Sequence, residues 1–223
     1  MTAVWDQISK LEQQITQMLC AYSTDASHHT VENYTWYNQI YSSSSFRRAH
    51  VEVVDFRKTH NIYILHSTIF PHYNDPSPIW GFDAVCGPNK ITGAFHDFSN
   101  GGDLNHPMMQ WFSNQSNGIK WKKQRQLPDW ATAIFSPSMI AAGNISETDE
   151  LDALCNVAVN SLEYYLCNVG KELDNPCDFR AAQDYYCQNQ KKNPHVVNSM
   201  VSMGVPKDTV IEFVNTVLFP ESN

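Results

Sequence analysis

The spacing of hydrophobic residues changes along this chain, and each change marks a different kind of predicted element. Between positions 4 and 22 apolar side chains recur every three or four residues, which predicts a helix with one buried face. The polar stretch 23–45 is expected to be a loop with one short helix. From position 48 to 98 the period falls to two, which predicts four strands at 48–56, 61–70, 79–86 and 91–98.

The second half of the chain returns to the helical period. A short helix is expected near 108–112, and a longer one follows Ser146, with an apolar stripe over 151–166. The remaining predicted helices, the last two opened by proline in the first turn, are 178–190, 194–203 and 206–218.

This order of elements indicates a fold class. Consecutive strands with short connections form an antiparallel meander, and helices before and after the strands can cover both faces of the sheet. We therefore expect an α+β fold in a single domain over residues 1–223, built as an α/β/α sandwich with a central antiparallel β-sheet flanked by helices.

The net charge and the hydropathy of the sequence limit the classes of partner that this protein is expected to bind. The chain has 23 acidic and 15 basic residues, a formal charge of −8, which argues against nucleic acid as the main partner. Its apolar runs fall short of the roughly 20 residues of a membrane span, and no signal peptide pattern opens it. A cytoplasmic protein is expected. An aromatic content of 12% suits a protein that encloses a flat apolar ligand, although an aromatic-rich core is the more ordinary explanation.

Familiar cofactor motifs are missing from the sequence. The six cysteines are irregularly spaced, without a C-x-x-C pair, and are expected to be free thiols. The nine glycines form neither a dinucleotide-binding nor a phosphate-loop pattern, and no G-x-S-x-G nucleophile motif occurs. We expect no bound cofactor and no metal.

The predicted strands carry most of the ionisable residues that could do chemistry: His50, Glu52, His66, Asp83, His96 and Asp97. His50 and Glu52 are two residues apart, so both emerge on one face of a strand. His66 and Asp83 lie within apolar runs, where an imidazole or a carboxylate is costly unless it is paired or used.

Three interpretations of these residues stay open at this point. A histidine–aspartate hydrogen bond can stabilise the interior of the sheet. Alternatively, a buried aspartate beside a histidine can hold a proton near neutral pH and donate it to a substrate. Two histidines and a carboxylate can also bind a metal, although the spacing favours no particular one.

Six short motifs follow one another in a fixed order: F-R-R-A-H-V-E at 46–52, L-H-S-T-I-F-P-H at 65–72, W-G-F-D at 80–83, L-P-D-W with I-F-S at 127–136, Y-C-x-x-Q-x-x-N at 186–193 and V-L-F at 217–219. Together they resemble the ferredoxin-dependent bilin reductases, most closely the phycocyanobilin:ferredoxin oxidoreductase subgroup. Each motif alone is unspecific, but six in family order are specific.

The resemblance implies an enzyme that binds biliverdin IXα between the sheet and the C-terminal helices, without a prosthetic group. Reduced ferredoxin would supply single electrons, and the protein would supply protons to bilin radicals. By position, Asp83 matches the central proton-donating aspartate and His66 the histidine that pairs with it. The substrate-binding candidates are His50, Glu52, Asn193 and, for the propionates, Arg47.

One position departs from the family pattern. Most members have Asn-Asp where this chain has Asn193-Pro194, so a second proton donor is missing. This combination resembles short phage-type members, which implies phycoerythrobilin as product, formed through 15,16-dihydrobiliverdin in an infected cyanobacterial host. The alternative product is phycocyanobilin, because that subgroup uses the position of Glu52 to reduce the D-ring vinyl group.

The partners follow from the same resemblance and from the distribution of charge. A basic cluster could steer acidic ferredoxin to a monomeric enzyme despite the net negative charge: Lys120, Lys122, Lys123 and Arg125. A non-catalytic bilin carrier and a metal-dependent hydrolase remain as alternatives from other classes, but neither accounts for six ordered motifs.

Overall fold

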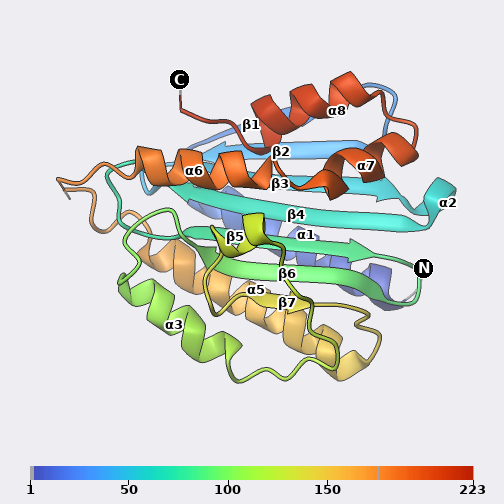
Figure 1. The fold of residues 1–223 in the computed structure, drawn as a ribbon, viewed down its shortest axis with the longest axis horizontal. Coiled ribbons are helices and arrows are strands. Elements are labelled where there is room, and N and C mark those ends of the chain that lie inside the picture. Colours follow the sequence, from blue (N-terminus) through green and yellow to red (C-terminus); the bar gives the residue numbers. More distant parts are fainter. Residues whose placement is uncertain (1–2, 175, 223) are drawn as a thin grey trace.

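The computed structural model describes residues 3–174 and 176–222, and its centre is one antiparallel β-sheet (Figure 1). The strands lie side by side in the order of the chain, so each pairs with the next one along the sequence. They are β1 (Asp25–Thr30), β2 (Trp36–Ser42), β3 (Phe46–Phe56), β4 (Ile62–Pro71), β5 (Ile79–Cys86), β6 (Ile91–Ser99) and β7 (Ile140–Ala142).

Helices cover both faces of this sheet. In Figure 1 the red and orange helices α6, α7 and α8 lie in front of the strands, whereas α1 and α5 lie behind them. The helices are α1 (Ala3–Tyr22), α2 (Arg57–His60), α3 (Pro107–Ser116), α4 (Asp129–Thr132), α5 (Thr148–Asn168), α6 (Arg180–Gln190), α7 (Pro194–Ser202) and α8 (Lys207–Phe213), which continues into the π-helix η1 (Val214–Leu218). The predicted α/β/α sandwich is confirmed.

The four predicted strands are β3 to β6, but the loop expected over 23–45 is wrong. This segment forms the hairpin of β1 and β2, which pair in register from Asp25 opposite Ser42 to Thr30 opposite Tyr37. Strand β1 is exposed along its whole length, so its sequence has no apolar alternation. Such a polar edge strand satisfies its backbone through β2 without burying side chains.

The predicted helices are found close to their expected ends, with two changes: the short helix expected near 108–112 extends as α3 to Ser116, and the C-terminal helix changes type. The expected helix 206–218 is α-helical only to Phe213 and continues as the π-helix η1. Partly buried Arg48 on β3 donates a hydrogen bond from Nη2 to the carbonyl of Val217 in this turn. The end of the chain is thereby tied to the sheet. No helix in the described residues is long and apolar enough to cross a bilayer.

Two hydrophobic cores lie on the two faces of the sheet. The larger one packs α1, α3 and α5 against one face, and Ile8, Ile15 and Leu162 are completely buried in it. The smaller one joins the other face to α6, α7, α8 and η1. Because side chains alternate along a strand, β3 to β6 present an apolar set to the larger core and a partly polar set to the other face.

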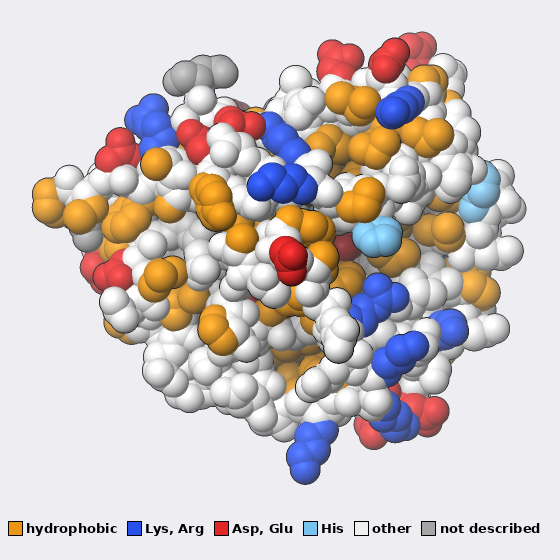
Figure 2. All heavy atoms as spheres, viewed as in Figure 1, with side chains coloured by type: hydrophobic (Ala, Val, Ile, Leu, Met, Phe, Trp, Pro, Cys, Tyr) orange, Lys and Arg blue, Asp and Glu red, His pale blue; other side chains and the backbone are white. Residues whose placement is uncertain are grey.

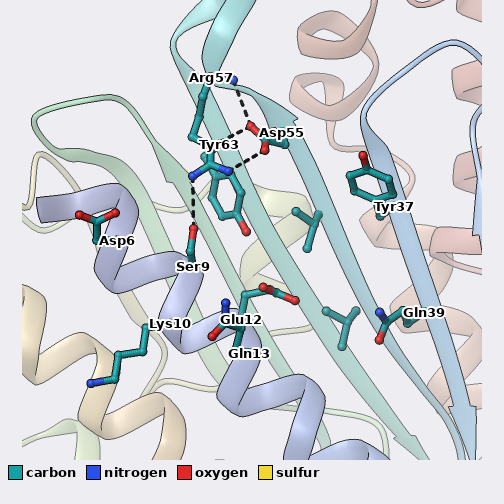
Figure 3. A pocket seen from close by; sticks show the side chains of 12 residues that line it. Asp6, Ser9, Lys10, Glu12, Gln13, Tyr37, Gln39, Asp55, Arg57 and Tyr63 are labelled. Carbon is teal, nitrogen blue, oxygen red and sulfur yellow. Dashed lines mark hydrogen bonds and ion pairs between the residues drawn. The ribbon is translucent and has the colours of Figure 1, made fainter. Parts of the chain in front are cut away.

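A depression of about 550 Å³ lies on the α1 side of the sheet (Figure 3). Its wall carries the ion pair of Arg57 with Asp55, whose atoms are 2.6 Å apart, and Arg57 Nη1 also donates to Ser9. Tyr63 lies beneath the guanidinium, 4.6 Å from ring centroid to Cζ. Arg57 and Asp55 thus engage each other in this depression, and the predicted site residues lie elsewhere.

Candidate active site

A cavity of about 360 Å³ lies between the sheet and the C-terminal helices. Strands β3 to β6 form its floor, and residues of α4, α6, α7 and η1 form its walls and roof. Figure 2 looks onto this face of the molecule and shows a hollow right of centre. Three of the predicted residues, Glu52, His66 and Asp83, line the floor, and Asn193 lines the roof.

Strand register brings the floor residues into one row. Glu52 on β3 lies opposite His66 on β4, and His66 lies opposite Asp83 on β5. Side chains of directly opposite residues emerge on the same face, about 5 Å apart at Cβ. His66 Nδ1 is 3.6 Å from Glu52 Oε2. Three ionisable groups therefore share one buried strip at the bottom of the cavity.

The expected hydrogen bond between His66 and Asp83 is not formed. The Nδ1 atom of His66 faces Glu52 on β3, and at 3.6 Å it makes no hydrogen bond with any described residue. Although the register makes His66 and Asp83 neighbours, the imidazole turns its Nδ1 toward the opposite strand. The imidazole of His66 thus faces Glu52, whereas the resemblance implied that it pairs with Asp83.

Burial sets the protonation of this row. It raises the pKa of Glu52 to about 8 and that of Asp83 to about 7, because a carboxylate is poorly solvated there. Burial also lowers the pKa of His66 to about 4. Near neutral pH Glu52 therefore holds its proton, His66 is neutral and Asp83 is close to its midpoint. Such acids can donate protons at the pH of a cell.

Glu52 has a partner that the sequence did not suggest. The indole Nε1 of Trp36 on β2 donates a hydrogen bond to Glu52 Oε1 over 2.7 Å. Trp36 is completely buried, and the ring of Phe213 on α8 packs against it with centroids 4.2 Å apart. Trp36 and Asn38 are buried on either side of exposed Tyr37, which is the alternation of a strand. The sequence did not predict this strand, because the neighbouring residues are mostly polar.

His50 lies beside the cavity floor and is not among the residues that line it. Its Nε2 is 2.9 Å from Oδ1 of Asn38 on β2, and its ring centroid is 6.2 Å from that of His66. Burial and the nearby Arg48 guanidinium hold the pKa of His50 well below its ordinary value. His50 is therefore a neutral group that supports the row from one side.

Two other predicted residues lie away from the cavity floor. The guanidinium of Arg47 packs against the rings of Phe70 and Tyr73, and its Nε donates to Gln183 over 2.7 Å. The side chain of His96 faces the larger core, where Nε2 is 2.7 Å from Ser161 Oγ. Arg47 is fixed outside the cavity lining, and the His96 imidazole is separated by the sheet from the Glu52 row.

The aspartate beside His96 faces the cavity and is held in place. Asp97 accepts hydrogen bonds from the backbone and hydroxyl of Ser136 and from the hydroxyl of Ser99. Burial raises its pKa to about 6, although these hydrogen bonds favour the carboxylate. Asp97 thus fastens the segment after α4 to the sheet.

The roof carries the residues around the departure from the family pattern. Asn193 caps α7, with Oδ1 accepting a hydrogen bond from the His195 backbone over 3.0 Å, and Pro194 occupies the first helical position. His195 lines the cavity as well. In α6, Gln190 donates to the Tyr186 hydroxyl over 2.8 Å. The roof therefore offers amide, phenol and imidazole groups.

Arg125 is the arginine that lines this cavity, beside Gly93 and Phe95. Its guanidinium lies 5.7 Å from the Phe95 ring centroid, and Nη2 donates to the Thr92 carbonyl over 2.9 Å. Its charge opposes the rise in the pKa of Asp83. Among the described residues, no three histidine, cysteine, aspartate or glutamate side chains converge as metal ligands.

Comparisons with known proteins identify the family and support the fold. Residues 2–220 match the family described as ferredoxin-dependent bilin reductase. A phycocyanobilin:ferredoxin oxidoreductase from Prochlorococcus marinus is 26% identical over 199 residues, covering 84% of this chain and 76% of that protein. A solved structure titled PcyX superposes with a TM-score of 0.69 at 25% identity, covering 97% of this chain and 99% of that one.

A more distant structure shows the same fold. The crystal structure of phytochromobilin synthase from tomato, in complex with biliverdin, superposes with a TM-score of 0.66 at 13% identity. It covers 93% of this chain and 82% of its own. Because the family match extends over almost the whole sequence, this protein is an oxidoreductase that belongs to the ferredoxin-dependent bilin reductase family.

Proposed function

We propose that this protein reduces biliverdin IXα to phycoerythrobilin, through 15,16-dihydrobiliverdin, with electrons from reduced ferredoxin. The observation that carries the proposal is the buried row of Glu52, His66 and Asp83 at the floor of the cavity. Each of the two reductions adds two electrons and two protons to the pigment. Ferredoxin carries electrons only, so the protons must come from the protein or from water.

Asp83 is the proposed proton donor for the first pigment radical. Its pKa of about 7 allows it to be protonated in a large fraction of molecules at neutral pH and to release the proton readily. Neutral His66 beside it can accept a hydrogen bond from a lactam or pass a proton along the row. Glu52 adds a second carboxyl group that is mostly protonated at this pH.

Binding of the pigment is assigned to the residues around the row. The rings of Phe95 and Phe219 provide apolar surface for the flat tetrapyrrole. Arg125 is the proposed partner of a propionate, because it lies on the cavity wall and a guanidinium pairs well with a carboxylate. Arg47 remains a weaker candidate for this role, since its guanidinium is engaged by two rings and Gln183.

We propose phycoerythrobilin over phycocyanobilin as the product because of the residue at the start of α7, in the roof of the cavity. Pro194 cannot titrate, so α7 supplies no carboxylic proton at the position where most relatives have aspartate. The carboxyl protons available to the pigment then come from the sheet. The competing observation is Glu52, whose position serves D-ring reduction in the phycocyanobilin subgroup, and for this reason phycocyanobilin is the alternative product.

Ferredoxin is proposed to dock beside the cavity wall that carries Arg125. On the face shown in Figure 2, lysine and arginine side chains gather on the right-hand side below the hollow. The basic cluster contains Lys120, Lys122, Lys123 and Arg125. The Nζ atom of Lys122 lies 3.8 Å from Oε2 of Glu147, and this carboxylate offsets part of the positive charge of Lys122. Lys120, Lys123 and Arg125 are therefore the stronger candidates for steering an acidic donor.

Anaerobic incubation with biliverdin, ferredoxin and a reducing system, followed by chromatography against both bilin standards, tests the proposal. Phycoerythrobilin is the expected product, and transient absorption of 15,16-dihydrobiliverdin should precede it. Accumulation of phycocyanobilin would establish the alternative. Bound biliverdin without any ferredoxin-dependent spectral change would instead identify a pigment carrier.

A further inference from the structure

Trp36 contacts one of the two carboxyl oxygens of Glu52, and this asymmetry carries an inference about proton position. The indole Nε1–H is 2.7 Å from Oε1, whereas Oε2 lies 3.6 Å from His66 Nδ1. An indole N–H can only donate a hydrogen bond, and a carboxylic O–H must find an acceptor. A proton on Oε1 would therefore make this oxygen a weaker acceptor for the indole N–H, whereas a proton on Oε2 leaves Oε1 as a carbonyl oxygen that accepts well.

We propose that Trp36 is a positioning residue that keeps the proton of Glu52 on Oε2, the oxygen next to His66. When Glu52 is protonated, the indole N–H donates to Oε1 as a carbonyl oxygen. When Glu52 is ionised, the indole N–H donates to the same atom as a carboxylate oxygen. With Oε1 occupied by the indole, the carboxyl proton of Glu52 is on the oxygen that faces the His66 imidazole. The catalytic role of this proton rests on the proposed function. The contact between Trp36 and Glu52 is observed independently of that function.

The surroundings of Trp36 keep the indole in this orientation. The side chain is completely buried, it stands beside Val54 in the β2–β3 register, and Phe213 packs on it. The indole has little room to rotate away from Glu52. The ionisable groups beside Glu52 are His66 on β4, whose Nδ1 lies 3.6 Å from Oε2, and Asp83 on β5, whose charge adds to the rise in the pKa of Glu52. His50, two residues earlier on β3, contacts the His66 ring.

Substitution of Trp36 by phenylalanine removes the N–H and keeps most of the apolar volume. Trp80→Phe is the matched control, since Trp80 is also completely buried and donates from Nε1, but to Ser161 on the opposite face of the sheet. In infrared difference spectra of the ligand-free protein, the carboxylic C=O band of Glu52 is identified by its loss in Glu52→Gln.

Trp36→Phe should move this band to higher frequency, because the carbonyl loses its donor. It should also raise the midpoint of Glu52 titration by about one pH unit, since the lost hydrogen bond favoured the carboxylate. Trp80→Phe should change neither. An unchanged band and midpoint in Trp36→Phe, or equal changes in both variants, would overturn the inference.

A measurement on the unaltered protein decides the matter if Trp36→Phe does not fold. With ¹⁵N-labelled indoles, the Trp36 Nε1–H resonance should move with the same midpoint as the Glu52 infrared band, while the Trp80 resonance stays fixed. A Trp36 resonance that ignores this titration would refute the contact. Absence of biliverdin reduction would contradict the proposed function alone, because both spectroscopic tests use the ligand-free enzyme.

Discussion

Replacing Glu52 by glutamine should make the free energy of unfolding less dependent on pH, because the buried Glu52 carboxyl group is destabilising when it ionises. Glu52 is 5% exposed, and its pKa rises from 4.5 to about 8 on burial. An acid whose pKa is higher in the folded state binds more protons there than in the unfolded chain. Its contribution to stability is therefore lost as the pH rises from 4.5 through about 8.

The size of this loss follows from the two pKa values. Between about pH 6.5 and about pH 8, linkage gives a decrease of about 1.6 kcal/mol in the free energy of unfolding from Glu52 alone. The window begins at the ordinary pKa of histidine, so the buried imidazoles add a change of opposite sign at its lower end, and this change is common to both proteins. Asp83, with its pKa raised to about 7, adds about 0.8 kcal/mol of the same sign in both proteins.

Urea unfolding of the ligand-free protein at both ends of the window provides the measurement. The original protein should lose about 1.6 kcal/mol more than Glu52→Gln between the two pH values. Glu163→Gln, an exposed position on α5, is the control and should follow the original protein. Parallel pH profiles for Glu52→Gln and the original protein would refute the reasoning that burial keeps this carboxyl protonated.

Further predictions address catalysis. Asp83→Asn should still bind biliverdin, with a changed visible spectrum, but slow ferredoxin-dependent reduction by about 100-fold or more in anaerobic single-turnover experiments, because an amide cannot act as the acid; normal turnover would contradict its role. Lys123→Glu, like added salt, should slow reduction in stopped-flow measurements without weakening biliverdin binding, and an unchanged rate would exclude this surface. Pro194→Asp should place a carboxylate at the first turn of α7 and alter the product ratio in chromatography; an unaltered ratio would show that this position does not select the product.

The sheet was predictable where burial imposes a pattern. Strands β3 to β6 have apolar alternation because one of their faces packs on α1 and α5. Strand β1 buries nothing, and β2 combines buried Trp36 and Asn38 with exposed Tyr37, so neither has the usual signature. These strands are specified by pairing with their neighbours, which a single-sequence pattern does not display.

The site was predictable in its floor and less so in its surroundings. Strand spacing and motif order together identified Glu52, His66 and Asp83, which the structure places in one row. The hydrogen bond from Trp36 crosses from a strand that was not predicted. His96 and Asp97 were both candidates, and the structure separates them: the Asp97 side chain faces the cavity and the His96 imidazole faces the larger core, because adjacent strand residues point to opposite faces.

The strict order of the strands has a consequence for how this enzyme can change. The acid row comes from one uninterrupted stretch, β3 to β5, whereas the cavity roof comes from α4 and the segments after α5. Substitutions in the roof can therefore reshape the space around the pigment while the strand pairing that aligns the acids stays intact. Under the proposed function, the proton donors of the floor and the groups of the roof are encoded in separate lengths of chain, so a substitution at Pro194 is expected to leave the row of Glu52, His66 and Asp83 in place.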